Sequence, residues 1–232
     1  EALHEVPKTY LAEVRWGLET DSGDGGGRAL RRGDAALLTA ERLEAALLPF
    51  LGWTAQTPPA TSNKRVDGER AYQRAHRGEV VVLPSQQVYL HRARWLAHSL
   101  PTSSTLEVVV RGGFYVRALA ADLGRALGVG AHLSALSRSA IGPYEDVVEP
   151  VELVGEDVLP WLPSVQLSDA QWGVLKGGGI LQADPPTRAT AGRWSLPSSF
   201  PAPSAGVRAM HQGRLVALLR GEGPPLLLPG GV

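Results

Sequence analysis

The stretch Leu106-Glu-Val-Val-Val-Arg-Gly-Gly-Phe-Tyr-Val-Arg-Ala-Leu-Ala-Ala-Asp-Leu-Gly-Arg-Ala-Leu-Gly128 leads from a predicted strand directly into a predicted helix. Branched residues run almost unbroken to Val110, which predicts a buried strand. Apolar residues then recur at helical spacing until Gly128 ends the pattern. Tyr115 and Arg117 therefore project from a rigid corner between the two elements.

Further strands and helices are predicted on the N-terminal side of this corner. Alternating residues predict a strand at 9–16, and two more strands are expected at 79–83 and 87–95. Thr39 can cap a helix whose leucines recur at helical spacing, and a short polar helix is expected at 69–77. These elements indicate an α/β (α+β) protein built on a mixed sheet.

Two glycine-rich segments look like ligand-binding motifs but lack essential parts of them. Residues 21–27, Asp-Ser-Gly-Asp-Gly-Gly-Gly, have no lysine or helix start close behind, as a phosphate loop would require. Residues 128–133 follow a helix and lack the last glycine of a dinucleotide fingerprint. We therefore expect a flexible loop at 21–27 and a helix-to-helix turn at 128–133.

The composition changes near Val158, where proline, glycine and serine become frequent. Short hydrophobic runs separated by turns follow. We therefore predict a larger domain at 1–157 and a small β-rich domain at 158–232. The segment 185–203 is long and poor in apolar residues, so we expect a mobile or variable loop there.

The overall composition is that of a soluble globular protein. Hydrophobic residues make up 44% and charged residues 20% of the 232 residues, and the net charge is zero. The absence of cysteine and of any apolar run long enough to cross a bilayer predicts a cytosolic (cytoplasmic) protein. The six histidines show no paired spacing, which argues against a metal site. Bases outnumber acids between Lys64 and Arg94, which allows a phosphate-binding surface or merely a solvated face.

Five segments form an ordered series along the chain. They are Lys8-Thr-Tyr10, Pro58-Pro-Ala-Thr-Ser-Asn-Lys-Arg-Val-Asp-Gly68, Arg70-Ala-Tyr-Gln-Arg-Ala-His-Arg-Gly78, Gly113-Phe-Tyr-Val-Arg-Ala-Leu-Ala-Ala-Asp-Leu-Gly124 and Gly130-Ala-His-Leu-Ser-Ala-Leu-Ser-Arg138. In order and spacing they resemble the TruB family of bacterial tRNA pseudouridine synthases. A single short motif has a high false-positive rate, whereas five in the correct order are hard to obtain by chance.

The resemblance implies a fold and an activity. The fold would be a pseudouridine synthase catalytic core, of which 1–157 form the C-terminal part, with a PUA-like RNA-binding domain at 158–232. The activity would be the isomerisation of uridine 55 in the T-loop of tRNA to pseudouridine, for which the base must leave the RNA stack. The partner would be the T-arm of tRNA, bound by a monomer without a cofactor, a metal or a membrane.

The resemblance also implies roles for individual residues. Tyr10 would stack on the flipped uracil and could take part in proton transfer, and Arg117 would orient the catalytic aspartate through an ion pair. Tyr115 would line the uridine pocket, and Leu136 would contact the base from the turn after the main helix. Each role has an alternative. Tyr10 could be an ordinary strand tyrosine, Arg117 a surface arginine, and Tyr115 and Leu136 could simply pack in the core. The candidates for RNA binding are Lys64, Arg65, Arg74 and Arg77.

The chain departs from the family's pattern at several points. Thr61 and Asn63 replace an aromatic residue and an alanine, and Gln86 replaces an arginine, so RNA contacts there are expected to differ. The family's nucleophilic aspartate lies in a Gly-x-Leu-Asp-Pro-x-Ala loop, and no such sequence occurs in the 232 residues. Asp122 lies inside the main helix and is expected to support the fold instead.

Two hypotheses about function follow from this sequence. The first is a tRNA-uridine isomerase whose N-terminal part, with the aspartate, is not among these residues. The second is a tRNA-binding module that holds tRNA through its basic stretch and β-rich tail without catalytic activity.

Overall fold

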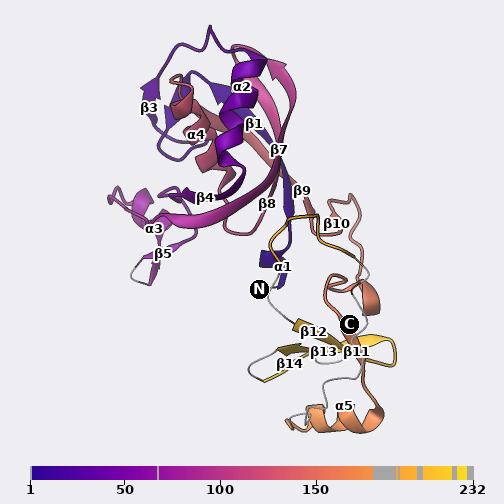
Figure 1. Cartoon of the computed structure of the whole chain (residues 1–232). Coiled ribbons are helices and arrows are strands. Elements are labelled where there is room, and N and C mark those ends of the chain that lie inside the picture. The colour runs from indigo at the N-terminus through magenta and orange to yellow at the C-terminus, as the bar shows by residue number, and fades with distance from the viewer. Residues whose placement is uncertain are drawn as a thin grey trace. The chain divides into compact units, whose positions relative to one another are not determined.

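The computed structural model describes residues 2–66, 68–179, 192, 194–202, 206–220 and 224–228. The chain divides into two units, Val6–Ile141 and a second one that combines Glu1–Glu5 with Gly142–Val232 (Figure 1). The division lies before the domain boundary expected from the sequence, so residues 142–157 belong to the same unit as the β-rich tail.

Five strands of the first unit form a sheet in the order β9-β1-β8-β7-β4, and each neighbouring pair is antiparallel. The strands are β1 (Lys8–Trp16), β4 (Gly52–Gln56), β7 (Gln86–Ser99), β8 (Ser103–Val110) and β9 (Ala131–Ile141). The predicted α+β class is confirmed, and so are the strands expected at 9–16 and 87–95. Antiparallel pairing replaces the mixed pairing that we expected in this sheet.

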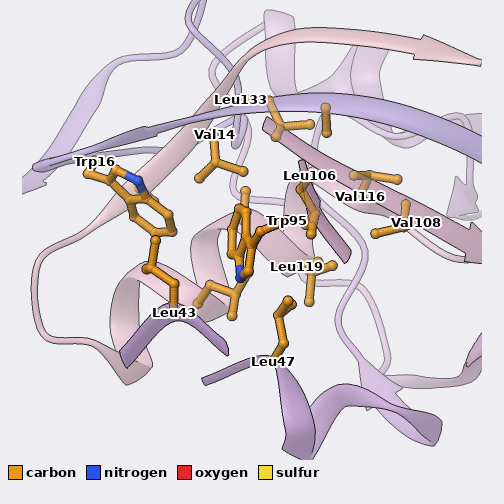
Figure 2. Close-up of a cluster of buried hydrophobic side chains, with 14 of the residues drawn as sticks. Val14, Trp16, Leu43, Leu47, Trp95, Leu106, Val108, Val116, Leu119 and Leu133 are labelled. Carbon is orange, nitrogen blue, oxygen red and sulfur yellow. The ribbon is translucent and has the colours of Figure 1, made fainter. Parts of the chain in front are cut away.

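The core of the first unit lies where α2 (Ala40–Leu47) and α4 (Val116–Ala126) pack against the sheet. Figure 2 shows Trp16 and Trp95 of the sheet near Leu43 and Leu119 of the two helices. The two indole rings have centroids 5.8 Å apart, and the Trp16 ring N–H donates to the Ser104 hydroxyl at 3.0 Å. Burial of each large apolar side chain contributes about 1.5–3 kcal/mol. This packing fixes α4 against the sheet.

Helix α2 begins where the sequence predicts. The Thr39 hydroxyl accepts a hydrogen bond from the backbone N–H of Arg42 at 3.3 Å, as an N-cap residue does. Leu43 and Leu47 are buried on its inner face. The 3-10 helix η1 (Leu48–Phe50) then leads into β4.

Several short elements complete the first unit. They are the hairpin β2 (Leu18–Thr20) and β3 (Ala29–Arg32), the hairpin β5 (Arg65–Val66) and β6 (Glu69–Arg70), and α3 (Ala71–His76). The polar helix expected at 69–77 is confirmed as α3. The strand expected at 79–83 is wrong, because these residues adopt no regular structure. Val80 and Val82 are 89% and 82% exposed, so neither branched side chain has a core to pack against.

The segment after α4 leads into a strand, and the helix-to-helix turn expected at 128–133 is wrong. The carbonyl of Gly124 accepts hydrogen bonds from the N–H groups of Val129 and Gly130, which reverses the chain into β9. A Cβ atom at Gly124 would lie 2.2 Å from the backbone nitrogen of Ala131. Helix and strand can therefore approach this closely only because residue 124 is glycine.

The second unit contains a small sheet in the order β11-β12-β13-β14. Its elements are α1 (Ala2–Glu5), β10 (Tyr144–Glu145), the 3-10 helix η2 (Gly155–Asp157), β11 (Ser164–Gln166), α5 (Asp169–Lys176), β12 (Gly206–His211), β13 (Arg214–Arg220) and β14 (Leu226–Leu227). The predicted β-rich tail is thereby confirmed. Of the loop expected at 185–203, residues 192 and 194–202 are described and adopt no helix or strand, and the other residues lie outside the described part of the chain. In the described parts of the chain, no helix is long and apolar enough to cross a membrane.

Candidate active site

Arg117, near the start of α4, joins three segments that are far apart in the sequence. Its Nη1 donates to the Asp24 carboxylate at 2.8 Å, to the Ser22 carbonyl at 3.2 Å and to the Thr61 hydroxyl at 3.0 Å. A cation in the first turn of a helix is disfavoured by the helix dipole, so these acceptors are needed to hold it there. The arginine is therefore part of an organised site rather than an isolated surface residue.

Asp24 was not predicted as a site residue from the sequence, and it lies in the segment expected to be a flexible loop. The Ser22 hydroxyl donates to its carboxylate at 2.7 Å, and the backbone N–H of Gly26 donates to the same oxygen at 3.1 Å. Asp21 closes the base of the loop by pairing with Arg28 at 3.0 Å. The only signal in the sequence was aspartate among glycines, and turn propensity explains that composition equally well.

The Asp24 carboxyl has a pKa below its ordinary value. Its partial burial alone would raise the pKa, but hydrogen bonds from Ser22, Arg117 and Gly26 and the charge of Arg117 outweigh that effect. Asp24 is therefore ionised at neutral pH and forms a true ion pair with Arg117.

Gly23 lets this loop approach the helix. Its φ of 73° lies in the left-handed region, and a Cβ atom there would lie 3.1 Å from both the Cβ and the carbonyl oxygen of Arg117. The same residue accepts a hydrogen bond from the backbone of Leu133 in β9 at 3.0 Å. The loop therefore rests on both α4 and β9, which places Asp24 beside the arginine.

An open cavity of about 960 Å³ lies beside this ion pair. Arg117, Asp24, Thr61 and Tyr72 are among the residues that line it, together with Val80. Small-molecule sites usually have volumes of about 300–1,000 Å³, so the space is sufficient for a nucleotide.

Tyr10 and Leu136 lie on one face of the sheet, on neighbouring strands. In the register of β1 and β9, Tyr10 lies opposite Arg138 and Leu136 lies opposite Ala12. Ala12 is buried in the core, so this is the face that α4 covers. Leu136 is thus on a strand rather than in the turn where we expected it, and it is 46% exposed. The structure brings these two predicted residues together.

A basic corner that was not predicted from the sequence lies at the start of β1. Lys8 shares its strand face with Tyr10 and pairs in register with Val110 at the end of β8. Burial, and then the charges of Arg138 and Arg111, lower the pKa of the Lys8 amine to about 8. Such a concentration of positive charge favours an anionic group nearby.

Tyr115 is the N-cap residue of α4, and the side chain of Gln56, at the end of β4, holds its backbone. The Gln56 carbonyl oxygen accepts from the Tyr115 N–H at 2.9 Å, and the Gln56 amide donates to the Tyr115 carbonyl at 3.1 Å. Gln86, for which we expected an altered RNA contact, donates to the Gly113 carbonyl at 2.8 Å.

Two of the four predicted RNA-binding residues are engaged by carboxylates. Arg77 pairs with Glu69 and with Glu79, and Arg74 pairs with Glu79 at 2.7 Å. Their charge is thus largely balanced within the segment. The other two, Lys64 and Arg65, are exposed, and Arg65 donates to the Gly68 carbonyl at 3.0 Å.

Asp122 takes part in an ion-pair network separate from that of Arg117 and Asp24. It pairs with Arg125, which also donates to Glu19 at 2.8 Å. Burial raises the pKa of the Asp122 carboxyl despite the nearby arginine. Among the residues that the structure describes, no group of three or more acidic or histidine side chains could hold a metal ion.

Comparisons with known proteins show the family of this chain. The model of the TruB family pseudouridylate synthase (N terminal domain) matches residues 1–116. The chain is 40% identical over 190 residues to the tRNA pseudouridine synthase B of Parasynechococcus marenigrum, a match that covers 77% of this chain and 65% of that protein. It is 36% identical over 230 residues to the tRNA pseudouridine synthase B of Mycolicibacterium paratuberculosis, covering 95% of this chain and 75% of that protein.

The chain therefore spans only part of its relatives, and 49% of the one from Dinoroseobacter shibae. A solved structure, that of a Cbf5-Nop10-Gar1 complex, has a similar fold with a TM-score of 0.57 and 21% sequence identity, covering 94% of this chain and 61% of that one. Since the family model matches half of the chain and one relative is matched over most of its length, the chain belongs to the TruB family of pseudouridylate synthases.

Proposed function

We propose that this chain is the larger part of a tRNA pseudouridine synthase that isomerises uridine 55 in the T-loop of tRNA. The observation that carries this proposal is the ion pair of Arg117 and Asp24 at the edge of an open cavity. A fixed guanidinium beside a cavity is suited to orienting a second, reacting carboxylate. Membership of the pseudouridylate synthase family supplies the reaction.

In this reaction the bond from C1′ of the ribose to N1 of uracil breaks, and a bond from C1′ to C5 forms. The proton on C5 then leaves to solvent and N1 takes up a proton from solvent, so that the product is an isomer of uridine. The base must rotate in the site between the two bonding steps. The site must therefore contact the faces of the base without holding its edge in one orientation. Tyr10 offers a ring for stacking, while Tyr115 and Leu136 would contact the base from the helix start and from β9.

We further propose that the nucleophilic aspartate comes from residues outside this chain. Among the residues that the structure describes, three hydrogen bonds of Arg117 use Nη1, and Nη2 makes only a longer contact of 3.5 Å to the Thr61 carbonyl. A guanidinium has five N–H donors, so Arg117 can bind a second carboxylate while it keeps Asp24. This supports a role in which Asp24 holds the arginine and the arginine orients the nucleophile.

A second candidate function is tRNA binding without catalysis by the 232 residues alone. No Gly-x-Leu-Asp-Pro sequence occurs in them, which favours this for the isolated chain. We propose that the second unit serves as a PUA-like RNA-binding module and that Lys64 and Arg65 contribute to RNA contact. The protein would act as a cytoplasmic monomer, with the T-arm of tRNA as its partner.

The test uses the natural full-length protein and a tRNA transcript labelled with tritium at C5 of uridine. Pseudouridine formation releases the label, and we expect release from the wild type but not from a transcript that carries cytidine at position 55. Arg117→Ala should slow release by about 100-fold or more. Arg125→Ala is the matched control, because Arg125 lies on the same helix but pairs with Asp122 and Glu19.

Two results would contradict the proposal. One is an absence of tritium release from the wild type, and the other is a normal rate in Arg117→Ala. The isolated chain of 232 residues is expected to bind the transcript and to release no tritium. Release above background by that chain would refute the proposed source of the nucleophile.

A further inference from the structure

Two glutamines from adjacent strands hold the main chain at the start of α4. Gln56 ends β4, Gln86 begins β7, and the two are direct partners in the register of these strands. Gln56 is only 4% exposed. Burying a primary amide costs free energy unless its donors and acceptor form hydrogen bonds, so the partners of Gln56 are the groups that it holds in place.

The side chain of Gln56 hydrogen-bonds both backbone groups of one residue, Tyr115. Its carbonyl oxygen accepts from the Tyr115 N–H at 2.9 Å, and its amide donates to the Tyr115 carbonyl at 3.1 Å. The Tyr115 carbonyl also accepts from the N–H of Leu119 at 3.1 Å, which is the first hydrogen bond of the helix. Tyr115 makes no side-chain cap of its own. Gln56 therefore replaces a local cap with one from a neighbouring strand.

The loop that precedes Tyr115 is anchored in the same manner. The N–H of Arg111 donates to the Tyr89 carbonyl at 3.0 Å, and Gln86 donates to the Gly113 carbonyl at 2.8 Å. Gly113 has a φ of 92°, so the chain turns sharply here before the helix begins. Each turn of the corner is thus tied to β4 or β7.

We propose that Gln56 is a positioning residue for pseudouridine formation, because it fixes Tyr115 and the first turn of α4, with Arg117, relative to the sheet. This inference rests on the proposed function. Helix ends fray when their backbone groups lack partners, and a shift of about 1 Å at a reacting group can cost about 100-fold in rate. Gln86 holds Gly113 in the loop before Tyr115 rather than the helix start itself, so we expect it to contribute less to the rate.

The first test compares three variants of the full-length protein in single-turnover tritium release. Gln56→Met removes both hydrogen bonds at similar volume and should slow release about 10- to 100-fold, while the Kd for tRNA changes less than about twofold. Gln86→Met should show a smaller loss. Gln87→Met is the control, because Gln87 is exposed on the same strand as Gln86. A wild-type rate in Gln56→Met, or a loss fully accounted for by its unfolded fraction, would overturn the inference.

The second test uses the conservative variant Gln56→Glu across a pH series. A protonated glutamic acid can still accept from the Tyr115 N–H and donate to its carbonyl, whereas a carboxylate presents two acceptors and repels that carbonyl. The rate of the variant relative to wild type should therefore fall as the pH rises and the buried acid ionises. The rates are divided by the folded fraction measured at each pH, which removes any loss that comes only from unfolding, and a flat ratio after this division counts against the inference.

The third test separates this inference from the proposed function. Amide hydrogen exchange at Tyr115 and Leu119 requires no activity, and Gln56→Met should exchange at least about tenfold faster there than Gln87→Met. If the wild type forms no pseudouridine, the proposed function fails and exchange alone decides whether Gln56 holds the corner. Equal exchange in the two variants would refute the clamp itself.

Discussion

Replacing Asp24 with asparagine removes the carboxylate that pairs with Arg117 while it keeps a side chain of nearly the same size. Asparagine can still accept from the N–H of Gly26, so the loop retains its main internal contact. The variant loses the charge that holds the guanidinium at 2.8 Å. It therefore tests the ion pair rather than the loop.

The expected change in stability is small. The side chains of Arg117 and Asp24 are 25% and 39% exposed, so solvent screens the pair. We expect a decrease of about 1 kcal/mol in the free energy of unfolding. The effect on catalysis should be larger, because an unheld arginine in the first turn of α4 will shift, and a loss of about 100-fold in rate corresponds to about 2.7 kcal/mol.

The difference in stability should also depend on pH. The pKa of Asp24 is lowered in the folded protein, so its ionised form stabilises the fold above the ordinary carboxyl range. That contribution is lost as the pH falls below about 4 and through the lowered pKa. The gap in unfolding free energy between wild type and Asp24→Asn should therefore be largest near neutral pH and close on acidification.

Single-turnover tritium release and thermal unfolding measure these two effects in the full-length protein. Asp21→Asn is the matched control, because Asp21 lies in the same loop but pairs with the exposed Arg28. We expect its rate to stay within about threefold of wild type. Equal rates for Asp24→Asn and wild type would refute the role of the pair, as would an equal loss in both variants.

Three further predictions concern other parts of the first unit. Tyr10→Ala should abolish most pseudouridine formation in the full-length protein while tRNA binding, measured by filter retention, stays intact; unchanged turnover would contradict its proposed stacking on the base. Gly124→Ala should lower the free energy of unfolding by about 1–3 kcal/mol in chemical denaturation, because the new Cβ meets the backbone of Ala131 at 2.2 Å, and a neutral result would contradict this packing. Lys64→Ala should reduce the salt dependence of log Kd by about one unit of slope, while Arg77→Ala should change it less because two glutamates already balance its charge. Equal slopes for these two variants would contradict that difference.

The elements with strong local patterns were predictable from the sequence. The strand at β1, the helix capped by Thr39 and the helix that begins at Val116 agree with the structure to within a few residues. Periodicity and capping depend on neighbours within a turn or a strand, so they can be read without tertiary information. The strand expected at 79–83 failed because branched residues favour a strand only when a sheet is there to receive them.

Some residues of the candidate site could be predicted from the sequence, and their spatial neighbours could not. The ordered segments of the sequence identified Tyr10, Tyr115, Arg117 and Leu136, and the family they indicated is confirmed. The alternation of β1 shows that Lys8 and Tyr10 share a face, but not that Leu136 lies beside them, since that requires the register of β9.

By itself, the sequence determined the family, the main helix and the identity of the arginine at its start. The tertiary structure decided what that arginine and the neighbouring tyrosine are bound to. Arg117 meets Asp24 across 93 residues, and Gln56 meets Tyr115 across 59. Such pairings leave no local pattern, because the intervening chain can fold in many ways until the sheet fixes both ends.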